Sequence, residues 1–185
     1  YFFRGSNGSG CGNDVASERK MVRKYIVDSV KYWANEYHID GFRFDLVGLL
    51  DVTTMNEVRA ALNEINPDIL VYGEGWSLST STVQSVDLAT QPNTYKMPGV
   101  GMFNDVIRSA IRGGNDGTTR GYATGDFDNV DALKGSIMAS NWFTNDPTQV
   151  INYISCHDNY TLWDKIQAST SWAWASTQTS MNKLA

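Results

Sequence analysis

The sequence has few of the residues that mark several common protein classes. Among its 185 residues there are two cysteines, Cys11 and Cys156, and they form no Cys-x-x-Cys pair. This excludes a zinc site built on cysteines and a disulfide-rich secreted scaffold. A single disulfide between the two has no support in the sequence, so two free thiols are the simpler expectation.

Long apolar runs and clusters of basic residues are also missing. No stretch approaches the roughly 18 consecutive apolar residues of a membrane span, and 15 Lys and Arg against 20 Asp and Glu give a net charge of −5. Neither nucleic acid nor a membrane is therefore an expected partner. The two histidines, His38 and His157, have no second ligand at metal-binding spacing, so no metal site is expected.

The residues that are present suit a globular chain, with 42% hydrophobic and 12% aromatic residues. Helical spacing of apolar residues extends to about residue 37, with Ser17 as the expected N-cap. Strands are expected at 42–47, 69–72 and 149–155, and helices over 53–65 (capped by Thr53 or Thr54), over 106–111, and from Asn159 or Thr161 on. This alternation predicts an α/β fold with a parallel sheet, either doubly wound or closed into a barrel.

Acidic residues stand where three of the expected strands end. Asp45 lies at the C-terminal side of the first strand, Glu74 follows the second, and Asp158 lies just beyond the last. In an α/β barrel the active site is assembled from several strand ends on that face. Asp45 and Glu74 are 29 positions apart, about one βαβ unit, so they should lie on neighbouring strands about 4.8 Å apart. Retaining glycosidases need two carboxyl groups about 5–5.5 Å apart, which this arrangement supplies.

Plainer interpretations of these acids stay open. Asp45 and Asp158 could each cap the helix that follows its strand. This alternative is weaker for Glu74, because no helix begins directly after it. Gly73 and Gly75 on either side of it let backbone or ligand approach closely.

Two basic residues accompany the acids. Arg43 alternates onto the same strand face as Asp45, where it could orient that carboxylate or form a purely structural ion pair. His157 stands beside Asp158 and could donate a hydrogen bond to a substrate hydroxyl or be a half-buried structural histidine. Serine catalysis is not supported, because no Gly-x-Ser-x-Gly elbow occurs.

Three segments, in order, give the sequence a resemblance to a known family: 41–46 (Gly-Phe-Arg-Phe-Asp-Leu), 71–76 (Val-Tyr-Gly-Glu-Gly-Trp) and 153–159 (Tyr-Ile-Ser-Cys-His-Asp-Asn). They resemble short signature segments of the α-amylase superfamily of glycoside hydrolases. Within it, segments 10–18, 101–105 and 157–165 resemble most the type I pullulanases, which are starch-debranching enzymes acting on α-1,6 links. The resemblance spans nearly the whole chain.

The resemblance implies a role for each matching residue. Asp45 would be the nucleophile that forms a covalent glycosyl enzyme, Glu74 the general acid and then base, and Asp158 the stabiliser of the transition state. Arg43 and His157 would complete the subsite around the cleaved sugar. The weaker candidates for contacts with the glucan are Trp76, Asn159, Asn13 and Asp14.

The resemblance also implies an incomplete domain. The family carries an earlier signature near the third barrel strand, an Asp followed shortly by Asn-His, and nothing in this sequence matches it. A complete barrel needs about 250 residues. We therefore expect residues 1–185 to be a fragment of a single catalytic TIM (β/α)8 barrel domain, covering roughly strands 4 to 7 and truncated at both ends. Half a barrel leaves two unpaired sheet edges, so the isolated polypeptide is expected to be inactive and poorly soluble.

Other activities remain as alternatives. One is a different member of the superfamily, such as an isoamylase or an α-1,4-acting hydrolase. Another is a barrel that binds glucan without cleaving it, which the presence of all three acids argues against, and a third is a metal-dependent phosphohydrolase that uses these acids. For the hydrolase, the expected partner is an α-glucan and no cofactor is required. A structural calcium ion is left open, although no Asp-x-Asp-x-Asp-Gly loop argues for one, and so is the cellular location.

Overall fold

The structure, a computed structural model, describes residues 2–78, 86–138 and 142–185. The chain divides into two compact units, Tyr1–Phe103 and Asn104–Ala185, and each is described by itself. The expectation that residues 1–185 belong to one barrel domain stays a prediction.

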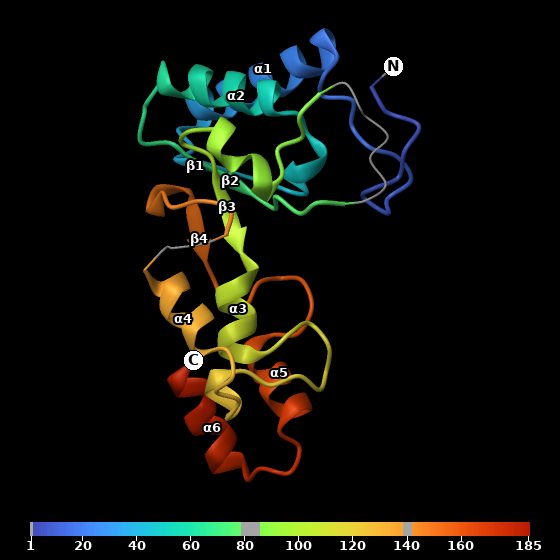
Figure 1. The fold of residues 1–185 in the computed structure, drawn as a ribbon. Helices are drawn as coiled ribbons and strands as arrows, with labels where there is room; N and C mark the ends of the chain where they lie inside the picture. The colour runs from blue at the N-terminus through green and yellow to red at the C-terminus, as the bar shows by residue number, and fades with distance from the viewer. Residues whose placement is uncertain (1, 79–85, 139–141) are drawn as a thin grey trace. The chain divides into compact units, whose positions relative to one another are not determined.

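The first unit is a parallel β/α arrangement. Its helices and longer strands are α1 (Lys20–Tyr37), β1 (Gly41–Phe44), α2 (Val52–Asn63), β2 (Leu70–Gly73) and β3 (Gly101–Asn104), whose last residue opens the second unit. β2 pairs in parallel with β1 and with β3. α1 and α2 lie side by side and cover the β1–β2 pair from one side (Figure 1). The predicted α/β fold class with parallel strands is confirmed, while closure into a barrel stays a prediction.

Apolar residues at helical spacing on α2 build the core of this unit. Met55, Val58 and Leu62 have no exposed surface, and their spacing of three and four places them on one helix face. Val71 of β2 and Met102 of β3 are buried as well. Each such side chain contributes about 1.5–3 kcal/mol when fully buried. This packing holds the strands, and therefore the residues that follow them, in fixed positions.

Two predicted helix caps are wrong, and one buried acid explains both. The N-cap of α1 is Arg19, which makes no capping hydrogen bond with its side chain. The N-cap of α2 is Asp51, not Thr53 or Thr54, and its carboxylate accepts a hydrogen bond from the Thr54 backbone N–H at 3.0 Å. Ser17 donates to the same carboxylate at 2.7 Å, across 34 positions of sequence. The hydroxyl of Ser17 is thus used in a tertiary contact, which local sequence rules do not anticipate.

The second unit is mainly helical. Its elements are α3 (Asp105–Arg112), α4 (Val130–Ile137), β4 (Val150–Asn152), α5 (Leu162–Ser169) and α6 (Ala175–Leu184). α3 packs against α4, and α5 against α6. The strand predicted over 149–155 is shorter than expected, because the chain leaves it after Asn152 and continues as a loop to Thr161. The sequence pattern does not predict α4 or α6.

The expectation of two free thiols is confirmed. Cys11 and Cys156 are both free and exposed. Within the described ranges, no helix combines the length and the apolar character needed to cross a bilayer.

Candidate active site

Asp45 and Glu74 follow neighbouring strands at the same level of the sheet. β1 and β2 pair in parallel with Phe44 opposite Gly73, the last residue of each strand. The residue that directly follows each strand is therefore one of the two acids, Asp45 after β1 and Glu74 after β2. The predicted placement of these carboxylates on adjacent strands is confirmed, and their chemical roles stay predictions.

Arg43 connects the two carboxylates. Its Nη1 pairs with Asp45 Oδ1, and its Nη2 lies 3.2 Å from Glu74 Oε1. The guanidinium carbon also lies 5.8 Å from the centre of the Phe103 ring, on β3. A planar guanidinium can hold two acceptors in a fixed fork, so both acids are oriented toward one cation. Arg43 therefore forms a structural ion pair and orients the carboxylates at the same time, so the two interpretations of this residue do not exclude each other.

Glu74 is held in a fixed environment. Its side chain is 10% exposed, and Oε2 accepts a hydrogen bond from the Leu46 backbone N–H at 2.9 Å. Leu46 has φ 43° and ψ 45°, a left-handed conformation that is unfavourable for a bulky residue. Such strain clusters at functional sites, where the surrounding structure maintains it. The left-handed conformation of Leu46 directs its backbone N–H toward the Glu74 carboxylate. The sequence did not predict this contact, because no residue pattern marks a leucine that adopts such a conformation.

Asp45 is far more open than Glu74, with a side chain that is 72% exposed. It does not cap the following helix, because the N-cap of α2 is Asp51. The capping interpretation of Asp45 is therefore wrong. Its carboxylate is accessible to a ligand, while its partner carboxylate is largely enclosed.

Gly73 and Gly75 allow the chain to pack closely on both sides of Glu74. A Cβ atom on Gly73 would lie 2.4 Å from the Phe44 carbonyl oxygen, and one on Gly75 would lie 2.6 Å from Met102 Sδ. The close approach expected at these glycines is thus made by the protein itself. Larger residues here would displace the segment that carries the acid.

His157, Asp158 and Asn159 lie together in the second unit, on the loop between β4 and α5. The side chains of His157 and Asp158 are 68% and 50% exposed, and His157 Nε2 lies 3.5 Å from Asp158 Oδ2. Asn159 adopts a left-handed conformation with φ 61°. Asp158 does not cap α5, since Thr161 is the N-cap and accepts from the Asp164 N–H at 3.2 Å. The convergence of Asp158 with Asp45 and Glu74 stays a prediction.

The weaker candidates differ in accessibility. Trp76 is half-buried and Asn13 is exposed. Asp14 is 1% exposed, and its carboxylate accepts hydrogen bonds from Ser6 Oγ at 2.6 Å and from two backbone N–H groups of its loop. Burial raises the pKa of Asp14, but these hydrogen bonds outweigh it, and the pKa lies below its ordinary value. The visible role of Asp14 is to organise the loop, and glucan contacts by these residues stay predictions.

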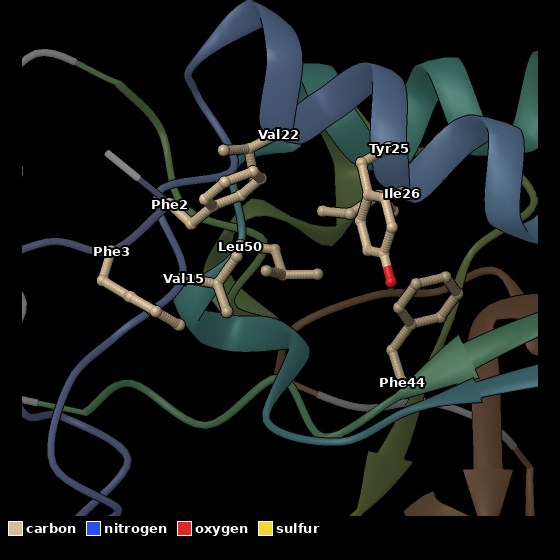
Figure 2. Close-up of a pocket in the computed structure, with 8 residues that line it drawn as sticks. All are labelled: Phe2, Phe3, Val15, Val22, Tyr25, Ile26, Phe44 and Leu50. Atoms are coloured by element: carbon tan, nitrogen blue, oxygen red, sulfur yellow. The ribbon is translucent and has the colours of Figure 1, made fainter.

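A cavity of about 570 Å³ lies between β1 and α1 (Figure 2). Phe44 lines it, and alternation along the strand turns Arg43 and Asp45 to the opposite face. The rest of the lining comes from Phe2, Phe3, Val15, Val22, Tyr25, Ile26 and Leu50. Apart from the Tyr25 hydroxyl, the side chains of this lining are apolar, whereas the strand exits carry two carboxylates and a guanidinium, so the strand exits are the better candidate site. Among the described residues, no three His, Cys, Asp or Glu side chains gather as metal ligands would.

No family model matches. The chain is 42% identical over 179 residues to a pullulanase of Bacillus subtilis (strain 168), covering 90% of this chain and 25% of that protein. It is 28% identical over 189 residues to the chloroplastic isoamylase 1 of Oryza sativa subsp. japonica, covering 86% and 22%.

The fold of the chain is similar to that of solved pullulanase structures. The crystal structure of a pullulanase from Anoxybacillus sp. LM18-11, complexed with maltotetraose, matches with a TM-score of 0.95 at 44% identity. The match covers 100% of this chain and 28% of that one. The chain spans a quarter or less of the length of the similar pullulanases from Bacillus subtilis and two Klebsiella species.

Proposed function

This chain is part of a pullulanase-type enzyme, a glycoside hydrolase, and we propose that it carries the reacting carboxylates of a retaining hydrolase for α-1,6-glucosidic links. The proposed substrates are pullulan, amylopectin or related α-glucans. The observation that carries the proposal is the bridge by Arg43 between Asp45 and Glu74 at adjacent strand ends. The retaining reaction uses a pair of carboxyl groups, and a pair held by one cation at neighbouring strand ends supports that mechanism.

The proposed reaction has two displacements. In the first, an Asp45 oxygen attacks the anomeric carbon, the bond from that carbon to the leaving oxygen breaks, and Glu74 gives its proton to that oxygen. In the second, Glu74 takes a proton from water, the water oxygen attacks the anomeric carbon, and the Asp45 carboxylate leaves. Two inversions at one carbon give net retention of configuration.

The accessibility of Asp45 and the fixed orientation of Glu74 support this division of roles. A nucleophile must reach the substrate, and the Asp45 side chain is 72% exposed. A proton donor and acceptor must keep one orientation through both steps, and the enclosed Glu74 is held by Arg43 and the Leu46 N–H. Such positioning lowers the entropy cost of reaching the transition state.

The remaining parts of the site complete the proposal. The strands belong to a (β/α)8 barrel, roughly its strands 4 to 7, and Asp158 joins the two acids to stabilise the transition state. Arg43 and His157 contact the cleaved sugar, with secondary contacts from Trp76, Asn159 and Asn13. The Anoxybacillus pullulanase is complexed with maltotetraose, which supports an α-glucan partner for this chain. The reaction requires no cofactor.

The roles are tested by two substitutions in the full-length enzyme. Asp45→Asn is expected to abolish hydrolysis of pullulan while glucan binding persists. Glu74→Gln is expected to form the covalent intermediate from α-maltosyl fluoride, whose leaving group needs no proton, and to hydrolyse pullulan very slowly. Asp28→Asn, which changes an exposed acid on α1, serves as the control with unchanged activity. Near-normal turnover of pullulan by Asp45→Asn would remove this residue from the mechanism.

The linkage is tested separately, by the products formed from pullulan. Cleavage of α-1,6 links releases maltotriose. Trisaccharides that retain an α-1,6 link would instead indicate α-1,4 cleavage and overturn the debranching assignment without affecting the roles of the carboxylates.

A further inference from the structure

We propose that one face of α3 positions the loop that carries His157 and Asp158. The face consists of Asn104, Arg108 and Arg112, which we call the α3 ladder. These residues are spaced four apart, from the N-cap to the last residue of α3, and this spacing puts them one above the other on a helix. The inference rests on the proposed function, in which Asp158 stabilises the transition state.

Asn104 joins the start of α3 to the end of β4. It has no exposed surface, and its Oδ1 accepts from the Val106 N–H at 3.1 Å and the Ile107 N–H at 3.4 Å, as an N-cap does. Its Nδ2 donates to Asn152 Oδ1 at 2.8 Å. Asn152 is the last residue of β4, so this contact fixes the point at which the loop departs.

Arg108 holds the first residue of the loop. Its Nη1 donates to the Tyr153 hydroxyl at 2.8 Å. The guanidinium carbon also lies 5.7 Å from the centre of the Tyr153 ring, within the range of a cation–π contact. Arg108 therefore contacts both the polar and the aromatic part of this side chain.

Arg112 holds the far end of the loop. Its Nη1 donates to the Tyr160 carbonyl oxygen at 3.2 Å, and its Nη2 donates to Asn115 Oδ1 at 2.9 Å. The residue is 2% exposed, and burial lowers the pKa of its guanidinium. Both described acceptors are neutral, and burying a charge among neutral acceptors is costly. Its two hydrogen bonds offset part of that cost, and one of them holds the backbone of the loop at Tyr160.

The ladder thus fixes both ends of a loop whose middle is open. Residues 155–160 are exposed, and the His157 and Asp158 side chains are mostly accessible to solvent. The contacts from α3 to Tyr153 and Tyr160 thus flank the segment that carries His157 and Asp158. A displacement of about 1 Å of a reacting group can reduce a rate by about 100-fold, so the ladder sets where Asp158 lies relative to a bound sugar.

The test is a double-mutant cycle in the full-length enzyme, with kcat and KM measured on pullulan. Arg112→Met is expected to lower kcat by about 10- to 100-fold and to change KM by less than about threefold, since a displaced Asp158 weakens mainly the transition state. Arg112→Lys, which can still donate to the Tyr160 carbonyl, should recover part of the lost kcat. Arg120→Met, at an exposed arginine of the same unit, is the matched control.

The cycle separates positioning from general support of the fold. In an Asp158→Asn background, Arg112→Met should cause little further loss of kcat, because its effect passes through Asp158. An equal loss in both backgrounds, or no loss in the wild-type background, would overturn the inference while leaving the proposed function intact. Unchanged kcat in Asp158→Asn alone would overturn the role of Asp158 and the inference with it. If Arg112→Met does not fold, the same cycle with the half-buried Arg108→Met decides the question by the same criteria.

Discussion

Replacing Arg43 should lower kcat as well as the stability of the fold. The guanidinium pairs with Asp45 and with Glu74, but the two pairs differ in their surroundings. Asp45 is 72% exposed, so solvent screens its pair, which contributes about 0–1 kcal/mol. Glu74 is 10% exposed, and a charged hydrogen bond to such a group contributes about 1.5–3 kcal/mol.

The expected effect on kcat therefore comes mainly from the contact between Arg43 and the enclosed Glu74. Arg43→Met keeps the length of the side chain and removes the cation, which leaves Glu74 with the Leu46 N–H as its other described donor. If the transition state loses the same free energy, about 1.5–3 kcal/mol, kcat falls by roughly 10- to 160-fold. Arg43→Lys should give an intermediate value, because an ammonium group lacks the planar fork that holds both acids at once.

The assay is release of reducing ends from pullulan by the full-length enzyme, with the melting temperature measured in parallel. Arg23→Met is the control, because it also removes an arginine with two acidic partners, Asp51 and Glu57. It should lower the melting temperature without lowering kcat. A folded Arg43→Met enzyme whose kcat stays within about threefold of wild type would refute the reasoning, since the bridge would then not set the geometry of the acids.

Three further predictions concern the frame around the site. Burial raises the pKa of Asp51, but hydrogen bonds from Thr54 and Ser17 and the charge of Arg23 lower it further, so the folded value lies below the ordinary one. Asp51 therefore stabilises the fold at neutral pH, and this contribution is lost as pH falls below about 4 and through the folded pKa. The melting temperatures of wild type and Asp51→Asn should converge in acid, and a constant gap would contradict this. Gly75→Ala should lower both stability, by about 1–3 kcal/mol, and kcat, because its Cβ would meet Met102 Sδ at 2.6 Å; exposed Ser77→Ala is the neutral control. A reducing agent should leave the melting temperature unchanged, since both cysteines are free, and a marked decrease would indicate a disulfide.

Much of the first unit was predictable because its signals are local. The helical spacing before residue 37 and the apolar runs before Asp45 and Glu74 correspond to α1, β1 and β2. A separation of about one βαβ unit then predicts adjacent parallel strands, and the pairing of Phe44 with Gly73 confirms it. Chain length and alternation are enough for this step, because a parallel neighbour needs a crossover helix of about that size.

The second unit was less predictable because its signals are weaker. α4 carries a glycine and polar residues, and α6 is rich in Ser and Thr, which have low intrinsic helix propensity. Their helical state depends on packing against α3 and α5. The strand predicted over 149–155 ends early at Asn152, because the apolar pattern continues into a loop that α3 holds from the side.

The sequence by itself determined the α/β class, the order of the main elements, and the adjacency of Asp45 and Glu74, because these follow from periodicity and spacing along one chain. Only the tertiary structure decided that one guanidinium links both acids and that a strained Leu46 donates to Glu74. It also decided that Ser17 bonds to Asp51 instead of capping α1, and that the Asp14 carboxylate is buried against Ser6. Those outcomes depend on which polar atoms are buried against each other when segments of the chain pack, because buried polar atoms need hydrogen-bond partners. A hydrogen bond across 34 positions, such as that from Ser17 to Asp51, leaves no pattern in the local sequence.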